Sequence, residues 1–416
     1  MDTIVERCAG LDVHKDTVVA TVRTPGKGRR RHTEAATFGT TARQVRELGD
    51  WLGGFGVTLV GMEATGVYWK PVFYGLEDRF TCWLLNAHHL RNVPGRKTDV
   101  ADSVWICQLV EHGLVRPSFV PPPPIRRLRN LTRARKAQIN ERGRTIQRLD
   151  KILQDAGVKL NSVASQTLSA SSRLMLDALV AGQRDPAVLA GFAKGRMRSK
   201  IPALREALDG HFDEHHGAIV GQLLAHLDAL DAGVATLDAR IVAHTQPWAE
   251  LVELLCTIPG VKQRTAEVLI AECGVDMSAF PTSAHLASWA GICPGNRESA
   301  GKHASGHTRP GPKWLRVALT EAAQAAARTT NTYLAAHFRV IRGRRGKAKA
   351  IGAVRHDILI AFWHILTKRE PYHDLKPRRR LAPAPLQPRE ANPAADPTTR
   401  EARPHRHAGT RHHLSR

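Results

Sequence analysis

Residues 5–22 read Val5-Glu6-Arg7-Cys8-Ala9-Gly10-Leu11-Asp12-Val13-His14-Lys15-Asp16-Thr17-Val18-Val19-Ala20-Thr21-Val22. Two apolar, β-branched runs flank a short polar segment, which is typical of a β-hairpin. After a Gly26-Lys27-Gly28 turn, a third run near 35–38 extends the hairpin into a predicted three-stranded antiparallel meander. Alternating patterns then predict a helix over 41–52, a strand over 58–62, a helix over 68–76 and a strand over 80–85. Hairpins first and crossovers later indicate an α/β domain of the RNase H-like kind.

Four carboxylates in this first quarter of the chain occupy informative positions. Asp12 and Glu63 each end an apolar strand-like run. Asp99 and Asp102 open an amphipathic segment, where a spacing of three places both on one helical face. We expect Asp12 on the central strand, Glu63 at the end of the fourth, and the Asp99/Asp102 helix packed across the sheet.

Converging carboxylates repel one another unless a divalent cation binds between them, and Mg²⁺ prefers such hard oxygen ligands. Two metal ions can activate an attacking oxygen and stabilise a leaving one in phosphodiester displacement. Taken singly, each of the four acids is better explained as a helix cap or a surface charge. Their joint placement favours a magnesium site, with Mn²⁺ as an alternative ion.

The overall charge points to a polyanionic partner. The chain has 61 Lys and Arg against 38 Asp and Glu, a formal net charge of +23, which favours nucleic acid. We found no run approaching the roughly 18 apolar residues of a membrane-spanning helix and no signal peptide at Met1–Glu6, so we expect a cytoplasmic, nucleoid-associated protein without a membrane partner. The six cysteines form no C-x-x-C pair, which indicates reduced, mostly buried thiols.

The middle of the chain is predicted to be helical. A stiff Pro121–Pro124 stretch precedes a basic helix over 126–148, in which Arg126, Arg127 and Arg133 are candidate nucleic-acid contacts. The alternative is a solvated helical face. Over 218–245, apolar residues recur in steps of three and four, and both a self-associating coiled coil and an intramolecular helical hairpin satisfy this pattern.

Beyond Leu251 the sequence predicts a second, mainly helical domain. Ile258-Pro259-Gly260-Val261 between two helical segments is typical of a helix-hairpin-helix, whose turn can present backbone N–H groups to a phosphate, or of a simple structural turn. Residues 296–316 form a small cationic loop leading into a helix. A hydroxyl there could attack DNA phosphorus and conserve the bond energy in a phosphoserine, although periodicity does not distinguish Ser299, Ser305 and Thr308.

Six short motifs stand out in combination. They are Gly10-Leu11-Asp12-Val13-His14-Lys15, Met62-Glu63-Ala64-Thr65-Gly66-Val67-Tyr68, Arg96-Lys97-Thr98-Asp99-Val100-Ala101-Asp102, Ile258-Pro259-Gly260-Val261, Trp289-Ala290-Gly291-Ile292-Cys293-Pro294 and Glu298-Ser299. Together they resemble the DEDD transposases of the IS-one-ten insertion-sequence family, a likeness that extends from about Gly10 to Tyr372. In that family the residue after the serine is often Gly, whereas this chain has Ala300.

The resemblance implies a RuvC-like domain, a coiled-coil connection and a C-terminal transposase domain with a catalytic serine. It also implies a structured bridge RNA that pairs with the transposon ends and the target DNA, and a composite active site across the subunits of a homo-oligomer, a dimer or a tetramer. Carried over by position, the metal-binding tetrad is Asp12, Glu63, Asp99 and Asp102, and the nucleophile is Ser299. Phosphate contacts would then come from Lys302, Arg309, Lys313 and Arg316.

The expected division is a RuvC-like domain over 5–120, a basic helical linker and coiled coil over 121–250, a C-terminal transposase domain over 251–375, and a disordered basic tail over 376–416. Three other functions fit parts of the sequence. A hydrolytic junction resolvase would use the tetrad without Ser299. An actin-like kinase would need a second Gly-rich phosphate loop, which the sequence lacks, and a non-catalytic nucleic-acid-binding protein would leave the acidic residues without a purpose.

Overall fold

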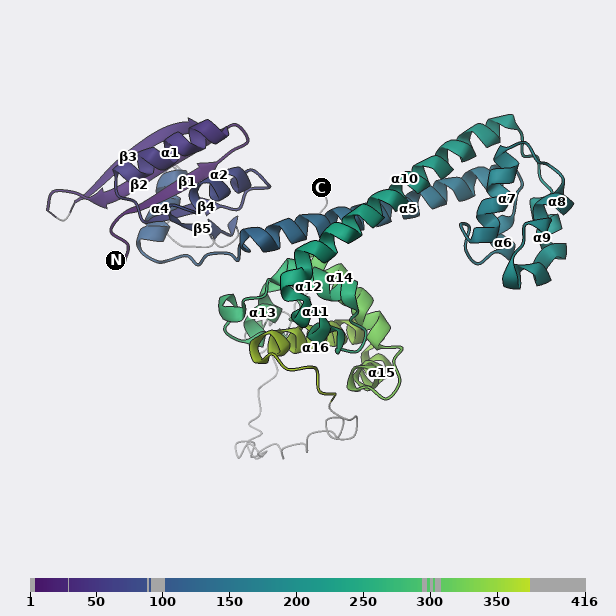
Figure 1. Cartoon of the computed structure of the whole chain (residues 1–416). Helices are drawn as coiled ribbons and strands as arrows, with labels where there is room; N and C mark the ends of the chain where they lie inside the picture. Colours follow the sequence, from purple (N-terminus) through teal and green to yellow (C-terminus); the bar gives the residue numbers. More distant parts are fainter. Residues whose placement is uncertain are drawn as a thin grey trace, which may run out of the picture.

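The computed structural model describes residues 4–28, 30–87, 90, 102–293, 298–299, 302–303 and 308–374. An α/β unit lies at one end of a long two-helix arm, a small helical unit lies at the other end, and a larger helical unit packs against the middle of the arm (Figure 1). The expected tail from residue 376 onward, Asp99 and Ser305 lie outside the described residues.

The α/β unit is built on a five-stranded mixed sheet of order β3-β2-β1-β4-β5. Its first three strands form the predicted antiparallel meander, while β4 and β5 run parallel to the central β1. The strands are β1 (Cys8–Val13), β2 (Thr17–Pro25), β3 (Arg31–Gly39), β4 (Leu59–Glu63) and β5 (Thr81–Leu85). The strand and helix predictions over residues 5–85 are therefore confirmed.

Helices cover both faces of this sheet. The α1 helix (Ala42–Gly54), capped by Thr41, and α2 (Trp69–Leu76) pack on the face that carries Leu11, Val13 and Ala20. The α4 helix (Asp102–Glu111) packs on the opposite face with Cys8, Leu59 and Leu85. Alternate residues of β1 thus enter two separate cores, as the two-residue period of a strand requires.

The arm is an intramolecular pair of long helices, α5 (Pro123–Asp155) and α10 (Glu214–Thr245). Ion pairs Arg135–Asp238 and Arg142–Asp231 show their antiparallel register. Of the two alternatives for residues 218–245, the structure has the intramolecular hairpin. The chain between the two helices forms a small helical unit whose core is rich in leucine. The unit consists of α6 (Leu160–Val163), α7 (Ala170–Val180), α8 (Pro186–Gly191), η1 (Gly195–Lys200) and α9 (Ile201–Leu208).

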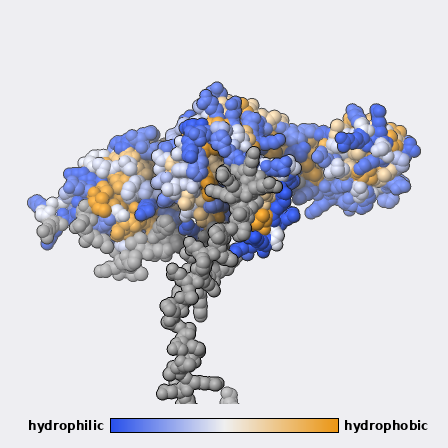
Figure 2. Space-filling view, turned by 90° about the horizontal axis from the view of Figure 1, so that it is seen from below, coloured by the Kyte–Doolittle hydropathy of each residue, from blue (hydrophilic) through white to orange (hydrophobic). Residues whose placement is uncertain are grey.

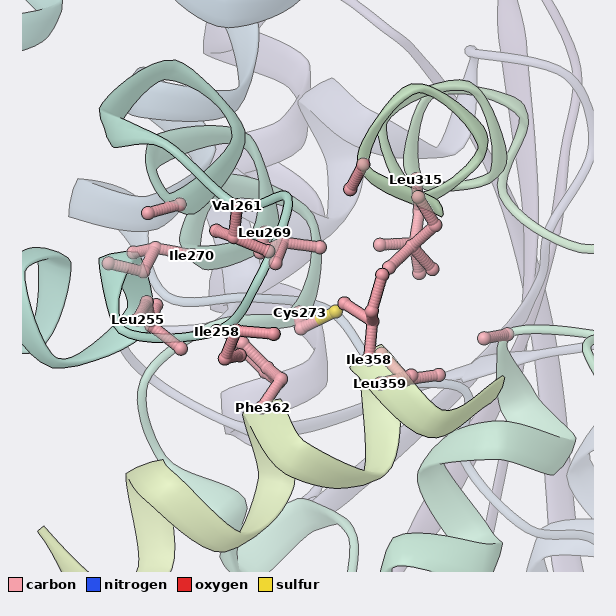
Figure 3. Close-up of a cluster of buried hydrophobic side chains, with 14 of the residues drawn as sticks. Leu255, Ile258, Val261, Leu269, Ile270, Cys273, Leu315, Ile358, Leu359 and Phe362 are labelled. Carbon is pink, nitrogen blue, oxygen red and sulfur yellow. The ribbon is translucent and has the colours of Figure 1, made fainter. Parts of the chain in front are cut away.

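The C-terminal unit is mainly helical and has the largest apolar core (Figure 3), to which Leu255, Ile258, Leu269, Leu315 and Phe362 belong. Its helices are α11 (Ala249–Cys256), α12 (Gln263–Cys273), α13 (Ser283–Trp289), α14 (Lys313–Ala326), α15 (Tyr333–Arg345) and α16 (Lys347–Lys368), with short 3-10 helices η2 (Gln246–Trp248) and η3 (Met277–Ala279). A two-stranded hairpin of β6 (Glu298–Ser299) and β7 (Lys302–His303) lies between α13 and α14 in the chain.

We expected no stretch to approach the apolar length of a membrane-spanning helix, and two helices of the described chain differ from that expectation. Glu214–Cys256 and Lys347–Lys368 are both long and apolar enough, by length and hydropathy alone, to cross a membrane. Core helices pass the same test, and Val354, Ile358 and Phe362 of α16 are buried in the C-terminal core. The face of the molecule drawn in Figure 2 is mostly hydrophilic, with smaller apolar groups on the α/β unit and at the tip of the arm. Apolarity in α16 is therefore explained by internal packing.

Only three of the six cysteines are buried, whereas we expected mostly buried thiols. Among the six free thiols, Cys8, Cys107 and Cys273 are buried, Cys82 and Cys293 are partly exposed, and Cys256 is exposed.

Candidate active site and nucleic-acid interface

Three of the four predicted carboxylates line one cavity. Asp12 near the end of β1, Glu63 at the end of β4 and Asp102 at the start of α4 surround a space of about 210 Å³. Thr65 and the half-buried Trp105 are among the other residues that line it. Side chains from three separate segments of the chain therefore meet at one edge of the sheet.

The close approach of α4 to the sheet brings Asp102 to this edge. A Cβ atom on Gly10 of β1 would lie 2.2 Å from the carbonyl oxygen of Ser103 and 2.4 Å from the backbone nitrogen of Cys107. Only glycine leaves room for the helix backbone there. The hydroxyls of Thr21 and Ser103 form a buried hydrogen bond of 2.9 Å that fixes the first turn of α4 over β2.

His14 is a polar neighbour that the sequence analysis did not select. Its Nε2 lies 3.2 Å from Oδ2 of Asp12, and its side chain is 59% exposed. The signal was its position two residues after Asp12, because alternate residues of an extended chain point to the same side.

The donor set fits magnesium. In the part of the chain that the structure describes, no group of three His, Cys, Asp or Glu side chains is arranged to bind a metal ion. Mg²⁺, however, usually keeps several waters and contacts only one or two carboxylates directly. Carboxylates of Asp12, Glu63 and Asp102 around a 210 Å³ cavity leave space for such a hydrated ion.

Ser299 lies on the β6–β7 hairpin, where its backbone pairs with Lys302. The segment that carries this hairpin is anchored at both ends. A Cβ on Gly311 would lie 1.9 Å from the carbonyl oxygen of Ala290. The residues before and after the serine-bearing segment are therefore in direct backbone contact. Nη2 of Arg309 also donates to the hydroxyl of Ser288 at 2.7 Å. These contacts fix the base of the serine-bearing segment against α13.

The predicted phosphate contacts fall around this segment and the helix that follows it. Lys302 is on β7, and Arg309 is exposed beside α13. Lys313 is the exposed first residue of α14, and Arg316 is one turn further along the same helix. Lys313 is therefore free to contact solvent or a ligand.

Two of the three candidate nucleic-acid contacts on α5 pair with acids of the protein itself. Arg126 donates to both carboxylate oxygens of Glu77 and stacks on the ring of Tyr74 at 3.9 Å. Arg133 makes two 2.8 Å hydrogen bonds to the buried Glu272. Such bidentate pairs satisfy the guanidinium groups. Of the three candidates on this helix, only Arg127 is exposed.

The turn between α11 and α12 is a packing contact. A Cβ on Gly260, whose φ is +86°, would lie 2.4 Å from the carbonyl oxygen of Ala322 and 2.5 Å from the backbone nitrogen of Ala326 on α14. The turn is thus covered by another helix of the same unit. This geometry favours the structural turn over the phosphate-binding alternative.

Comparison with known proteins places the chain among DNA transposases. A model of the DEDD transposases of the IS110 family matches residues 9–157, and a model described as "Transposase IS116/IS110/IS902 family" matches residues 252–339. The two matches together cover more than half of the chain, and they contain Asp12, Glu63, Asp102 and Ser299. The chain belongs to the IS110 family of transposases, so it acts in DNA transposition and binds DNA.

Two curated relatives agree with this assignment. A "Probable family 20 transposase" of Pseudomonas aeruginosa is 23% identical over 76% of this chain and 85% of its own length. An "Insertion element IS110 uncharacterized 43.6 kDa protein" of Streptomyces coelicolor is 37% identical over 24% of this chain and 25% of its own length.

Proposed function

We propose that the protein cuts and rejoins DNA strands through a covalent phosphoserine at Ser299, at a site that binds Mg²⁺ through Asp12, Glu63, Asp99 and Asp102. A structured bridge RNA pairs with the transposon ends and the target and supplies the sequence choice. The protein acts as a homo-oligomer in the cytoplasm, at the nucleoid. The RuvC-like domain over 5–120 and the transposase domain over 251–375 each provide part of the site.

The observation that carries this proposal is the common cavity of Asp12, Glu63 and Asp102. Grouped carboxylates at a strand edge disfavour one another, and such an arrangement is useful when a cation is bound there. A protein that only bound nucleic acid would gain nothing from this acidic cavity within a chain of net charge +23.

In the proposed reaction, Oγ of Ser299 forms a bond to a DNA phosphorus while the bond from that phosphorus to a deoxyribose oxygen breaks. The hydroxyl proton leaves to solvent, and the departing sugar oxygen takes up a proton. A hydroxyl of another strand then reverses these steps and releases Ser299. When bound, Mg²⁺ would offset negative charge on the phosphate. The Arg309 and Lys313 side chains would neutralise neighbouring phosphates.

The test is strand exchange by Ser299→Ala, with Ser305→Ala as the matched control in the same loop. We expect Ser299→Ala to abolish both the covalent protein–DNA adduct and strand exchange, while Ser305→Ala retains both. Strand exchange by Ser299→Ala would overturn the proposal. Cutting without an adduct in both proteins would establish the hydrolytic resolvase instead.

The same assay tests whether the site is shared between subunits. Asp12→Asn lacks a metal ligand and Ser299→Ala lacks the nucleophile, so each is expected to be inactive alone. If an intact tetrad from one subunit meets an intact serine from another, mixing the two variants restores part of the strand exchange. Failure of every mixture, with both variants folded and assembled, would place the complete site within one chain.

A further inference from the structure

Two arginines lie close to each other where α14 packs against α16. Arg316 belongs to α14 and Arg355 to the first half of α16, and these helices share the C-terminal core through Leu315, Leu319 and Ile358. Both guanidinium-bearing residues are partly buried. Two like charges are thus held together at the edge of a core, which costs free energy unless an anion is bound between them.

Arg355 is held in position without being neutralised. Its Nη1 donates to the hydroxyl of Thr320 at 3.3 Å, and that hydroxyl donates to the carbonyl oxygen of Arg316 at 2.7 Å. Its Nε is buried and has no hydrogen-bond partner within the described chain. Burial, and secondly the charge of Arg316, lower the pKa of Arg355. The side chain is therefore oriented as a donor with hydrogen-bonding capacity left unused.

The nearest carboxylates in the sequence are committed to other partners. Glu321, next to Thr320, accepts from Nζ of Lys136 at 2.7 Å. Asp357, two residues after Arg355, pairs with His337 at 2.6 Å. Within the described residues, no carboxylate lies within ion-pair distance of Arg316 or Arg355.

The surroundings of this pair favour a polyanion over a small ion. Lys313 lies one turn before Arg316 and is exposed. The corner between α15 and α16 adds a group of further exposed cations, which are Arg342, Arg344, Arg345, Lys347 and Lys349. Residues 339–349 contain no aromatic side chain on which an unpaired base could stack. Phosphates of a double helix are the ligand that such a surface recognises.

We propose that Arg316 and Arg355 together bind one backbone phosphate of duplex DNA, with Thr320 fixing the orientation of Arg355. This inference rests on the proposed function, in which the C-terminal unit contacts DNA beside Ser299. Arg355 is a residue that the sequence analysis did not select, because nothing in the spacing of α16 distinguishes it from a surface arginine. The contact is independent of base sequence.

The experiment compares duplex-DNA binding by the full-length parent, Arg355→Gln and Arg142→Gln over a range of salt concentrations. Arg142 is a matched control, since it is paired with Asp231 on the arm. Loss of one phosphate contact is expected to reduce the salt slope of log Kobs by about 1 in Arg355→Gln, with no change in Arg142→Gln. An unchanged slope in Arg355→Gln overturns the inference. A duplex RNA of the same length is the second arm, and a slope change with RNA alone would also overturn it.

A melting experiment separates binding from structure. Without DNA, Arg355→Gln is expected to melt at the same temperature as the parent or above it, because a like-charge contact is removed. Inorganic phosphate is expected to raise the melting temperature of the parent more than that of the variant. A lower melting temperature for Arg355→Gln would make Arg355 a structural residue and end the inference. Neither measurement depends on Ser299, so failure of the proposed chemistry is distinguishable from failure of this site.

Discussion

The arginines of α5 and those of the α14–α16 pair carry the same charge and have opposite surroundings. On α5, Arg126, Arg133, Arg135 and Arg142 each reach a carboxylate of another helix. Between α14 and α16, Arg316 and Arg355 have no carboxylate within ion-pair distance among the described residues. These arginines of the long basic helix α5 thus hold structural elements of the protein together, whereas the pair of Arg316 and Arg355 is left for a ligand.

The partners of the α5 arginines explain this difference. Glu77 comes from the end of α2, Glu272 from α12 and Asp238 from α10, so α5 is fixed to the α/β unit, to the C-terminal unit and to its partner helix in the arm. Arg129 adds hydrogen bonds to the carbonyl oxygens of Ala271 and Glu272 at the end of α12. A basic helix that crosses between units needs acids from those units, and these acids lie far away in the sequence.

The largest expected effect comes from Glu272→Gln. Glu272 is 1% exposed and accepts from Arg133 while lying 3.8 Å from Arg129. Its neutralisation leaves two guanidinium groups without a counter-charge in a desolvated place, and breaking such a buried pair costs about 3–5 kcal/mol. Urea unfolding measures the loss. Glu321→Gln, at an exposed acid paired with Lys136, is the control and is expected to cost under about 1 kcal/mol. Equal effects of the two changes would erase the contrast between buried and exposed pairs.

A smaller, pH-dependent effect is expected for His337→Gln. The hydrogen bond to Asp357, opposed by burial, raises the pKa of His337. A raised folded-state pKa stabilises the protein fully below the unfolded value of about 6.5, and the stabilisation is lost as the pH rises through the folded value. The parent should exceed His337→Gln by about 1–2 kcal/mol at pH 6, with a gap that closes at higher pH. A gap independent of pH would contradict the charged pair.

Local patterns predicted the α/β unit well. Strand periodicity and turn residues are properties of residues adjacent in the sequence, and they were sufficient to predict β1 to β5. Asp12 and Glu63 lie at one edge of the sheet because they stand near the ends of β1 and β4. The position of Asp102 was also predicted, because the helix that it begins was expected to pack across the sheet. Asp99 lies outside the described residues, so its place in the tetrad stays a prediction.

Long-range contacts account for what the sequence analysis missed. The small unit at the tip of the arm has short helices, and its core also contains Leu149 of α5 and Leu224 of α10. The residues around Arg133 in the sequence do not predict its pairing with Glu272, which is over a hundred residues away. The lack of a carboxylate partner for Arg355 among the described residues was equally hidden, since Asp357 is two residues away and pairs with His337 of α15 instead.

The smallest expected effect is that of Arg142→Gln, which tests the exposed end of the α5 set. Its side chain is 31% exposed and Asp231 is 52% exposed, so water screens the pair. Loss of such a surface pair costs about 0.2–1 kcal/mol, measured by urea unfolding. Because Asp231 already neutralises Arg142, the same variant should bind duplex DNA with the salt dependence of the parent. A reduced salt slope would show that arginines paired within the protein still contact DNA, and the distinction between the two sets would fail.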